Sequence, residues 1–456
     1  MTSGLPLTQN TNFNPADLLS ILVHPRKSAA DNLTMQPFAE LGALVEARWR
    51  DQNYNEGAFP EIAASALAEM PAPVDPWEII RWSQETPSLP EQMDPLGKFG
   101  NPPITVYVGP RFYIDVYYWL DGTTTIHQHA FSGAFQVLLG SSVHAGYRFQ
   151  QDREINPHFL TGQLTLDKVS LLSQGEIREI RPGSEFIHSL FHLDRPSATI
   201  TIRTYKAPSA AVQYSYLKPY LAINPFYSDA SLTKKAQTVA LLLRMKHADA
   251  DTLIGKMIDV SDFQTAYTVL EQAFHFLCHR ELEEIIGVSR SHDRFQTLLE
   301  RARHRHGELA DLLLPVFEEG WRQTEITRRR TEIKSPDHRF FLALLLNVPE
   351  RSSLLRLVQE RFPTQDSVEV VMGWIRELSA TRIFGSREPN VLGIADLDDL
   401  HLLVIRALLE GCSEEEIAAR VAADPERLAG ASSSLASVID QLRNLPFFKA
   451  IFEAGQ

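Results

Sequence analysis

The chain has 456 residues, of which 44% are hydrophobic and 22% are charged. This composition is ordinary for a soluble globular protein, excludes collagen-like, disordered and disulfide-scaffold classes, and the length suits two or three domains. The 57 acidic and 44 basic side chains leave a net charge of −13, which argues against nucleic-acid or anionic-membrane binding by the whole chain. The chain has two cysteines, its start lacks signal-peptide features, and it has no long apolar run. These features predict a cytoplasmic protein that does not cross a membrane.

Residues 1–100 carry short helical patterns interrupted by prolines. Between Phe38 and Trp49 the apolar residues repeat every three or four positions, as on one face of a helix. Pro15 and Pro76 stand where the first turn of a helix tolerates proline. We therefore expect an N-terminal helical segment over residues 1–100.

Residues 101–210 have the patterns of β-strands. Apolar and polar residues alternate over 112–119 and 143–149, and β-branched residues are enriched over 197–205. Glycines and prolines separate these stretches at short intervals, as in a β-sandwich or barrel.

Helical patterns continue from about residue 230 to the end of the chain. They predict helices over 236–245, 263–286, 295–317, 340–346, 368–378 and 397–409, and Ser413 with three glutamates after it is typical of a capped helix start. The predicted fold class is α+β, with a central β-barrel over 101–210 and a large all-α domain over 211–456.

Three histidines fall where strands could bring them together. His127 and His129 point to the same face of a strand, because side chains alternate with period two. His188 follows a Pro182-Gly183 turn and could come from an adjacent strand, with His192 as the competing third ligand. Imidazoles suit iron, copper, nickel or zinc, and three ligands leave positions open. His144 also lies near the turn and could line the cavity, but we expect it to be a solvated strand residue.

The order of these pieces resembles the two sequence motifs of cupins, and more finely the cysteine dioxygenase-like (thiol dioxygenase) branch. The resemblance covers about residues 100–208. It is carried, in chain order, by 112–119, by Ile126-His127-Gln128-His129, by 135–140 ending in Gly140, by His188, by Arg195-Pro196, and by Ile202-Arg203-Thr204-Tyr205.

The resemblance implies a cupin barrel (a double-stranded β-helix, or jelly roll) that binds Fe(II) through His127, His129 and His188. It also implies that Tyr205 is catalytic, with its hydroxyl near bound dioxygen or substrate. Arg203 replaces a histidine that supports this tyrosine in the family. Since Arg203 shares the strand parity of Tyr205, we predict that it binds an anionic substrate.

Two departures from the family concern the substrate. The stretch 101–108 lacks the arginine with which these enzymes hold the carboxylate of free cysteine, and Ala134 stands where some members have a cross-linking cysteine. The predicted function is therefore a non-haem Fe(II)- and dioxygen-dependent oxygenase acting on a small-molecule or thiol-containing substrate other than free cysteine. The alternative is a non-catalytic metal- or ligand-binding cupin with a regulatory or partner-binding helical domain. The open-site histidines and Tyr205 favour the enzyme, whereas the missing arginine and histidine favour the alternative.

The helical half carries two further patterns. His275, His279 and Glu283 share one helical face, which we expect to be a helix surface or an interdomain contact rather than a metal site. The basic stretches 290–305 and 328–330 alternate with acidic residues, as solvated helix faces do. The C-terminal helical domain could close the barrel mouth, form a homo-oligomer or bind a protein partner, and the sequence leaves these roles open.

Overall fold

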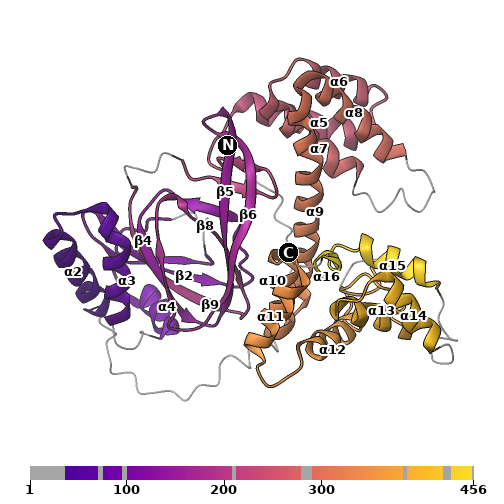
Figure 1. The fold of residues 1–456 in the computed structure, drawn as a ribbon. Coiled ribbons are helices and arrows are strands. Elements are labelled where there is room, and N and C mark those ends of the chain that lie inside the picture. The colour runs from indigo at the N-terminus through magenta and orange to yellow at the C-terminus, as the bar shows by residue number, and fades with distance from the viewer. Residues whose placement is uncertain are drawn as a thin grey trace.

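The computed structural model describes residues 36–69, 75–94, 100–207, 212–278, 290–383, 388–424 and 433–453. N-terminal helices, a β-barrel and a C-terminal helical region follow one another along the chain and lie in that order across the molecule (Figure 1). This arrangement confirms the predicted α+β fold class.

The N-terminal helices cover the outer face of one β-sheet. They are α2 (Gln36–Asp51), the 3-10 turn η1 (Glu56–Ala58), α3 (Phe59–Glu69) and α4 (Pro76–Glu85). Phe38, Leu41 and Phe59 form one buried cluster with Ile114 and Val116 of the sheet. The apolar stripe predicted between Phe38 and Trp49 is therefore the face that covers the barrel.

The barrel strands of the described chain are β1 (Pro103–Val108), β2 (Phe112–Trp119), β3 (Ile126–His129), β4 (Gly133–Leu139), β5 (Ser142–Asn156), β6 (Phe159–Leu172), β7 (Ile177–Ile180), β8 (Gly183–His192), β9 (Ser197–Thr204), β10 (Ser215–Leu217) and β11 (Leu221–Ile223). One sheet has the order β1-β2-β9-β4-β7, and the other contains β6-β5-β8-β3. From β2 to β9 the chain passes back and forth between these two antiparallel sheets, which is the topology of a double-stranded β-helix.

A short hairpin closes the second sheet into a barrel. β10 pairs with β3, and β11 pairs with β6, so that β10-β11-β6-β5-β8-β3 forms a closed ring. These two strands lie after residue 210, where the sequence placed the start of the helical domain. Their short length gives a weak strand pattern, and the barrel extends to Ile223 in the structure.

The helical region consists of two groups of helices joined by α9 (Figure 1). The first group holds α5 (Ala230–Arg244), α6 (Ala250–Asp259), α7 (Phe263–Leu277) and α8 (Arg290–His306), followed by η3 (Gly307–Leu312) and α9 (Leu313–Arg329). The second holds η4 (Arg330–Glu332), α10 (Pro336–Asn347), α11 (Arg351–Arg361), α12 (Ser367–Ser379), α13 (Asp399–Leu409), α14 (Glu414–Ala423), α15 (Leu435–Asn444) and α16 (Lys449–Phe452).

Two helix predictions differ from the structure. The helix expected over 295–317 is divided into α8, η3 and α9, because Gly307 adopts a φ of 61° that ends α8. The helix expected over 263–286 begins at Phe263 and is described as far as Leu277, while His279 and Glu283 lie outside the described residues.

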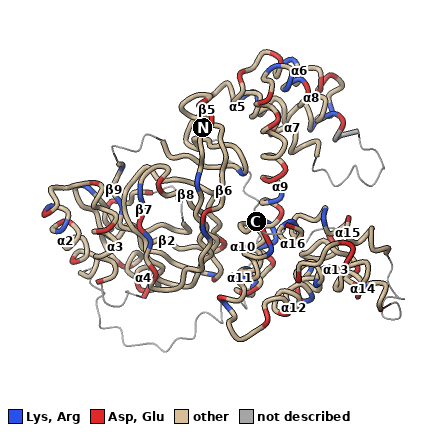
Figure 2. Tube along the Cα trace, viewed as in Figure 1, with Lys and Arg blue, Asp and Glu red and all other residues tan. Residues whose placement is uncertain are grey.

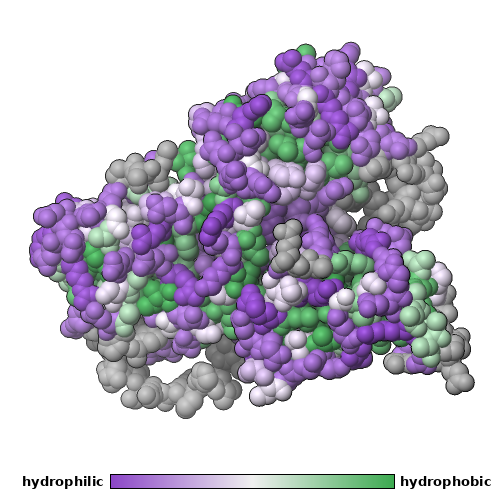
Figure 3. Space-filling model, viewed as in Figure 1, coloured by the Kyte–Doolittle hydropathy of each residue, from purple (hydrophilic) through white to green (hydrophobic). Residues whose placement is uncertain are grey.

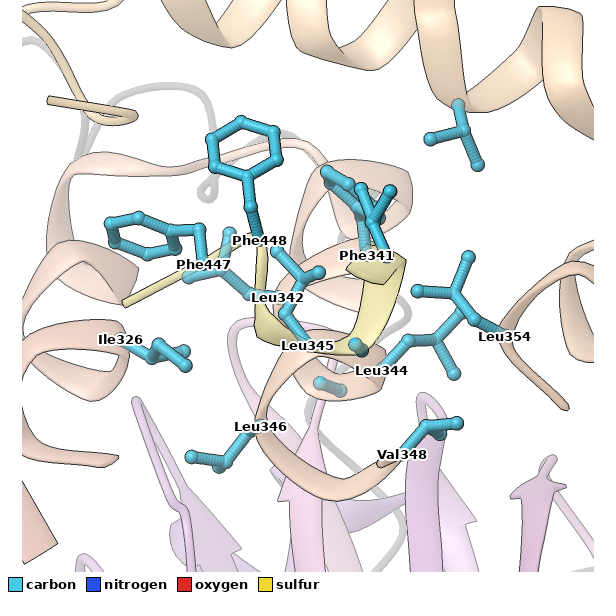
Figure 4. Packing of buried hydrophobic residues seen from close by; sticks show 14 of the residues in the cluster. Ile326, Phe341, Leu342, Leu344, Leu345, Leu346, Val348, Leu354, Phe447 and Phe448 are labelled. Atoms are coloured by element: carbon cyan, nitrogen blue, oxygen red, sulfur yellow. The ribbon is translucent and has the colours of Figure 1, made fainter. Parts of the chain in front are cut away.

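The barrel and the second group of helices share one hydrophobic core. Every residue of α10 from Arg339 to Asn347 is buried. Phe341, Leu342 and Leu345 of this helix pack near Phe447 and Phe448 (Figure 4), and the same cluster includes barrel residues such as Tyr147 and Phe191. The Tyr147 hydroxyl also donates to Asn347 Oδ1 at 2.9 Å, so α10 is joined to the side of the barrel by both apolar and polar contacts.

Charged residues of both signs are interspersed over the helices (Figure 2), and the viewed surface is mainly hydrophilic (Figure 3). The solvated faces predicted for 290–305 are confirmed, since Arg294, Arg301 and Arg303 form ion pairs with acidic neighbours. The same prediction is wrong for Arg329 and Arg330, which are 3% and 1% exposed. In the described ranges, no helix has both the length and the apolar character needed to span a bilayer.

Candidate metal centre

Two antiparallel strands bring the three predicted histidines together. His127 and His129 lie on β3, and His188 lies on β8 directly opposite His127. One ring nitrogen of each lies within 4.8 Å of the other two, and all three side chains are buried. In the part of the chain that the structure describes, this is the group with the spacing of a metal site. His192 is not a member of this group, so the spacing favours His188 over His192 as the third histidine.

The surrounding hydrogen bonds leave Nε2 of two of the three rings available to a metal. His127 Nδ1 lies 2.8 Å from the Thr125 carbonyl oxygen, so it carries the proton and donates. His188 Nδ1 lies 3.1 Å from His144 Nε2 and can donate in the same way. His129 Nδ1 is buried without a partner. Nε2 is then the nitrogen available to a metal on His127 and His188, and His129 Nε2 lies 2.9 Å from His188 Nε2.

The geometry of these nitrogens fits a bound cation. His129 Nε2 and His188 Nε2 are 2.9 Å apart. Two imidazoles bound at ~2.1 Å to one ion, at right angles to each other, have nitrogens about 3 Å apart. Without an ion, one of the two rings must adopt the other tautomer to avoid facing lone pairs. The spacing is that of two imidazoles bound to one ion, and it is equally that of a hydrogen bond from the N–H of one ring to the other ring.

Burial keeps these imidazoles in the form that binds metals. Burial lowers the pKa of His127, although the Thr125 carbonyl opposes the effect. Burial and the neighbouring imidazoles hold the pKa values of His129 and His188 well below the usual range. Neutral imidazole is the ligand form, so the site does not need to lose protons before binding a metal at neutral pH.

The three histidines are supported by two further residues, and the sequence did not predict this role for either of them. His144 of β5 lies behind His188, is 9% exposed, and has its pKa lowered to about 4 by burial. The expectation that it is solvated is wrong. The Phe186 ring lies 4.3 Å from the His188 ring and stacks on His129 and His144. His144 reaches His188 because β5 pairs with β8, and no local pattern in the sequence reveals that pairing.

A cavity of about 220 Å³ opens beside the three histidines. Its other walls come mainly from β2, β4, β8, β9 and the segments next to β10: Tyr117, Trp119, Thr124, Phe131, Phe135, Ile180, Leu190, Thr199, Thr201, Arg203, Gln213 and Phe226. No described residue beyond Phe226 lines it. The C-terminal helical region therefore packs against the side of the barrel and does not cover this cavity in the described part of the chain.

Arg203 is the cationic group of this cavity. Its guanidinium carbon lies 3.4 Å from the centre of the Phe131 ring. Its Nε is buried without a hydrogen-bond partner, and no carboxylate forms an ion pair with it among the described residues. Arg203 is half-buried and has no ion-paired carboxylate among the described residues, so this position suits an anionic group of a ligand.

Behind the cavity, a buried carboxylate fixes Tyr117. The Tyr117 hydroxyl donates to Asp115 Oδ2 at 2.8 Å, and Thr105 donates to Oδ1 at 2.7 Å. Burial raises the pKa of Asp115, although these hydrogen bonds oppose the effect. Tyr117 is therefore held as a fixed wall of the cavity, a role that the strand pattern over 112–119 did not reveal.

The structure does not bring Tyr205 to the histidines. β9 ends at Thr204, so the period-two argument that placed Tyr205 beside Arg203 does not extend to it. The Tyr205 hydroxyl donates to the Gly109 carbonyl oxygen at 2.8 Å, its side chain is 43% exposed, and the residue is outside the cavity lining. The catalytic role that the resemblance implied for Tyr205 has no support from this placement.

His192 lies on the same strand as His188 but has a different environment. Its ring stacks on Trp119, with ring centres 4.7 Å apart, and its Nδ1 lies 2.9 Å from Ser197 Oγ. Burial lowers its pKa to about 3. It is thus a neutral core histidine at the end of β8.

Comparison with known proteins found no match in sequence and only distant matches among solved structures. No family model matches the chain, and no curated protein matches it in sequence. Matching solved structures include an uncharacterised conserved protein with a double-stranded β-helix domain from Klebsiella pneumoniae, at 13% identity over 30% of this chain and 98% of that chain, with a TM-score of 0.18. DMSP lyase DddQ from Ruegeria pomeroyi matches at 12% identity over 40% of this chain and 96% of that chain, with a TM-score of 0.20. Peruvianin-I, a cysteine peptidase from Thevetia peruviana latex, matches at 17% identity over 27% and 70%, with a TM-score of 0.18.

At these identities and TM-scores the matches carry no argument about fold or activity. The resemblance to thiol dioxygenases in particular stays a prediction from the sequence. What the strand order and the histidine geometry establish is a double-stranded β-helix with a buried three-histidine group that could bind a metal ion.

Proposed function

We propose that this protein is a non-haem Fe(II)- and dioxygen-dependent oxygenase that acts on a small anionic substrate. The observation that carries the proposal is the convergence of three buried, neutral imidazoles beside a cavity that also contains a guanidinium without an ion-paired carboxylate among the described residues. A purely structural metal site would be closed by a fourth protein ligand, whereas three histidines leave positions for a substrate.

His127, His129 and His188 would hold the metal through Nε2. When bound, Fe(II) would supply the dioxygen chemistry for which three-histidine sites with open positions are suited. The second-layer contacts of Thr125 and His144 would orient two of these rings. The aromatic walls Phe131 and Phe135 would limit the access of bulk water to the reacting groups.

The cavity favours a small substrate with one negative charge. At about 220 Å³ it is smaller than the pockets that take drug-sized ligands. Arg203 would bind a carboxylate or sulfonate, and the Thr199 and Thr201 hydroxyls would be available to polar substituents. Because Arg203 comes from β9 and not from the 101–108 stretch, a substrate held by it would approach from a direction that differs from that expected for free cysteine.

The first test is the metal content of the protein purified without added metal, compared with a His127→Ala/His129→Ala variant. We expect near-stoichiometric iron that the variant loses. Zinc in place of iron, or no metal in either protein, would overturn the iron oxygenase.

The second test measures dioxygen uptake by the iron-loaded protein with two thiols of similar size. 3-Mercaptopropionate carries a carboxylate, and cysteamine carries an ammonium group. We expect uptake with the anionic thiol, and a rise in its KM of roughly tenfold or more in Arg203→Gln. If iron is bound but neither these thiols nor other small anions stimulate uptake, the non-catalytic ligand-binding cupin becomes the better account.

A further inference from the structure

A second and larger cavity lies in the helical region. It has a volume of about 660 Å³ and is formed by α7, α9 and the turn between β10 and β11, with Glu388 at its edge. It shares no residue with the cavity beside the three histidines. His275, which the sequence singled out as part of a helical face, lines this cavity.

Aromatic rings form much of its wall. The Phe317 ring lies 5.4 Å from that of Phe274 and 5.7 Å from that of Tyr267, and Trp321 lines the cavity one helical turn beyond Phe317. The π-faces of such rings attract cations, and their bodies bury apolar groups.

Glu271 is the carboxylate of this cavity that has no counter-ion. The Tyr267 hydroxyl donates to its Oε1 at 2.5 Å, and no ion pair to Glu271 forms within the described part of the chain. By contrast, Glu325 and Glu388, which also line the cavity, are both bound by Arg328, at 2.8 and 2.6 Å. Glu271 sits four residues after Tyr267 on α7, on the face that lines the cavity.

The one lysine in the lining does not compensate this charge. Lys218 donates to the Leu346 carbonyl oxygen at 3.3 Å, and its ammonium lies 5.2 Å from the centre of the Tyr147 ring. Neither of these partners lines the cavity, so the ammonium is engaged on the barrel side. Glu271 therefore faces the cavity with the Tyr267 hydroxyl as its hydrogen-bond donor and with no cationic partner among the described residues.

We propose that this cavity is a second binding site, and that it takes an organic cation with an aromatic or aliphatic body. The ammonium group would lie against Glu271, and the body would pack among Phe274, Phe317 and Trp321. Such a ligand satisfies both the charge and the aromatic walls, whereas an anion would face an uncompensated carboxylate. The proposal does not depend on the metal or on the oxygenase activity.

The test uses isothermal titration calorimetry of the full-length protein with benzyltrimethylammonium chloride. 3-Phenylpropionate, an aromatic anion of similar size, is the comparison probe. We expect saturable binding of the cation, no binding of the anion, and an affinity for the cation at least tenfold lower in Glu271→Gln. Glu308→Gln removes one negative charge from the same group of helices outside the cavity, and should bind like the wild type.

A second variant keeps the test decisive if Glu271→Gln is poorly folded. Gly320 lines the cavity from α9, and a Cβ placed there meets no atom within 4 Å. Gly320→Leu should therefore fill part of the cavity without disturbing α9, and should weaken cation binding by tenfold or more. Absence of cation binding to the wild type, equal binding by Glu271→Gln or Gly320→Leu, or tighter binding of 3-phenylpropionate would overturn the proposal.

Discussion

The contact between His144 and His188 links the metal centre to the strand behind it. His144 Nε2 lies 3.1 Å from His188 Nδ1, and a hydrogen bond donated by Nδ1 would fix the tautomer of His188 that leaves its Nε2 available to a metal. We predict that His144→Ala lowers metal affinity by about 10- to 100-fold, because the ring of His188 loses this partner. The measurement is metal retention against a chromophoric chelator.

His158→Ala is the matched control, since His158 stacks on Tyr227 with ring centres 3.9 Å apart and does not contact the three histidines. It should retain metal like the wild type. Equal retention by His144→Ala would show that His188 is oriented by its packing on Phe186 alone.

At the residue scale, the alternation of side chains along a strand predicted the positions of some site residues and not of others. The parity of His127 and His129 and the turn before His188 predicted the metal group, since these features are local. His144 could not be found in this way, because its role depends on the register of β5 against β8. Tyr205 was misplaced because parity holds only within a strand, and β9 ends one residue earlier.

At the element scale, a polar network holds the C-terminal end of α10. Arg322 of α9 donates to the Leu345 and Leu346 carbonyl oxygens, and Lys218 also donates to Leu346. These are orphan carbonyls at the negative end of the helix dipole, where cations stabilise a helix. Glu319 pairs with Arg322 at 2.7 Å and completes the network.

This network predicts a pH dependence of stability. Burial raises the pKa of Glu319, but hydrogen bonds from Arg322 and Gln323 and the charges of Arg322 and Lys218 outweigh it and hold the pKa at about 2. Because the folded pKa is below the unfolded value of about 4.3, ionised Glu319 stabilises the fold above about pH 5. This contribution, on the order of 3 kcal/mol, is lost as the pH falls toward 2.

We therefore expect Glu319→Gln to be less stable than the wild type at pH 7, with a difference that shrinks between pH 5 and pH 2. Urea unfolding at several pH values measures it. Glu318→Gln, a change at the exposed neighbouring position, should follow the wild type throughout. If the difference in stability between Glu319→Gln and the wild type does not change with pH, ionised Glu319 is not the source of the pH dependence.

A second element-scale contact joins the helical region to the loop before β3. Arg330 of η4 donates to the Gly122 and His192 carbonyl oxygens and to Thr123, and it lies over the Phe191 ring. This loop leads directly to Thr125, whose carbonyl oxygen orients His127. The helices thereby support the strand that carries two metal ligands.

We predict that Arg330→Met lowers the free energy of unfolding by about 2–4 kcal/mol, because it leaves buried carbonyl groups without a donor. Arg328→Met, two residues away and half-exposed, should lower it by less than about 1 kcal/mol. Chemical unfolding of both variants gives the comparison, and similar losses would mean that the Arg330 contacts contribute little.

At the scale of the whole molecule, the sequence predicted the succession of helices, barrel and helices correctly. Composition and periodicity are local properties, and they change at each transition. The closure of the barrel by β10 and β11 was missed, because three-residue strands leave no periodic signal. The burial of Arg329 and Arg330 was also missed, since a basic run has the same appearance in a solvated helix and at an interface.

The shared core of the barrel and α10 leads to the last prediction, which concerns unfolding. Tyr147, Phe191 and the side chains of α10 belong to one buried cluster, so the barrel and the second helical group should lose structure together. A metal that binds only the folded barrel stabilises it by about 2.7 kcal/mol at one hundred times its dissociation constant. We expect this stabilisation to extend to the helices.

Circular dichroism at a helix-sensitive wavelength should therefore show a higher melting temperature with metal than with chelator, and no such shift in His127→Ala/His129→Ala. If the helical signal melts at the same temperature in both conditions while the β-strand band of the infrared spectrum shifts, the two parts unfold independently and the shared core does not couple them.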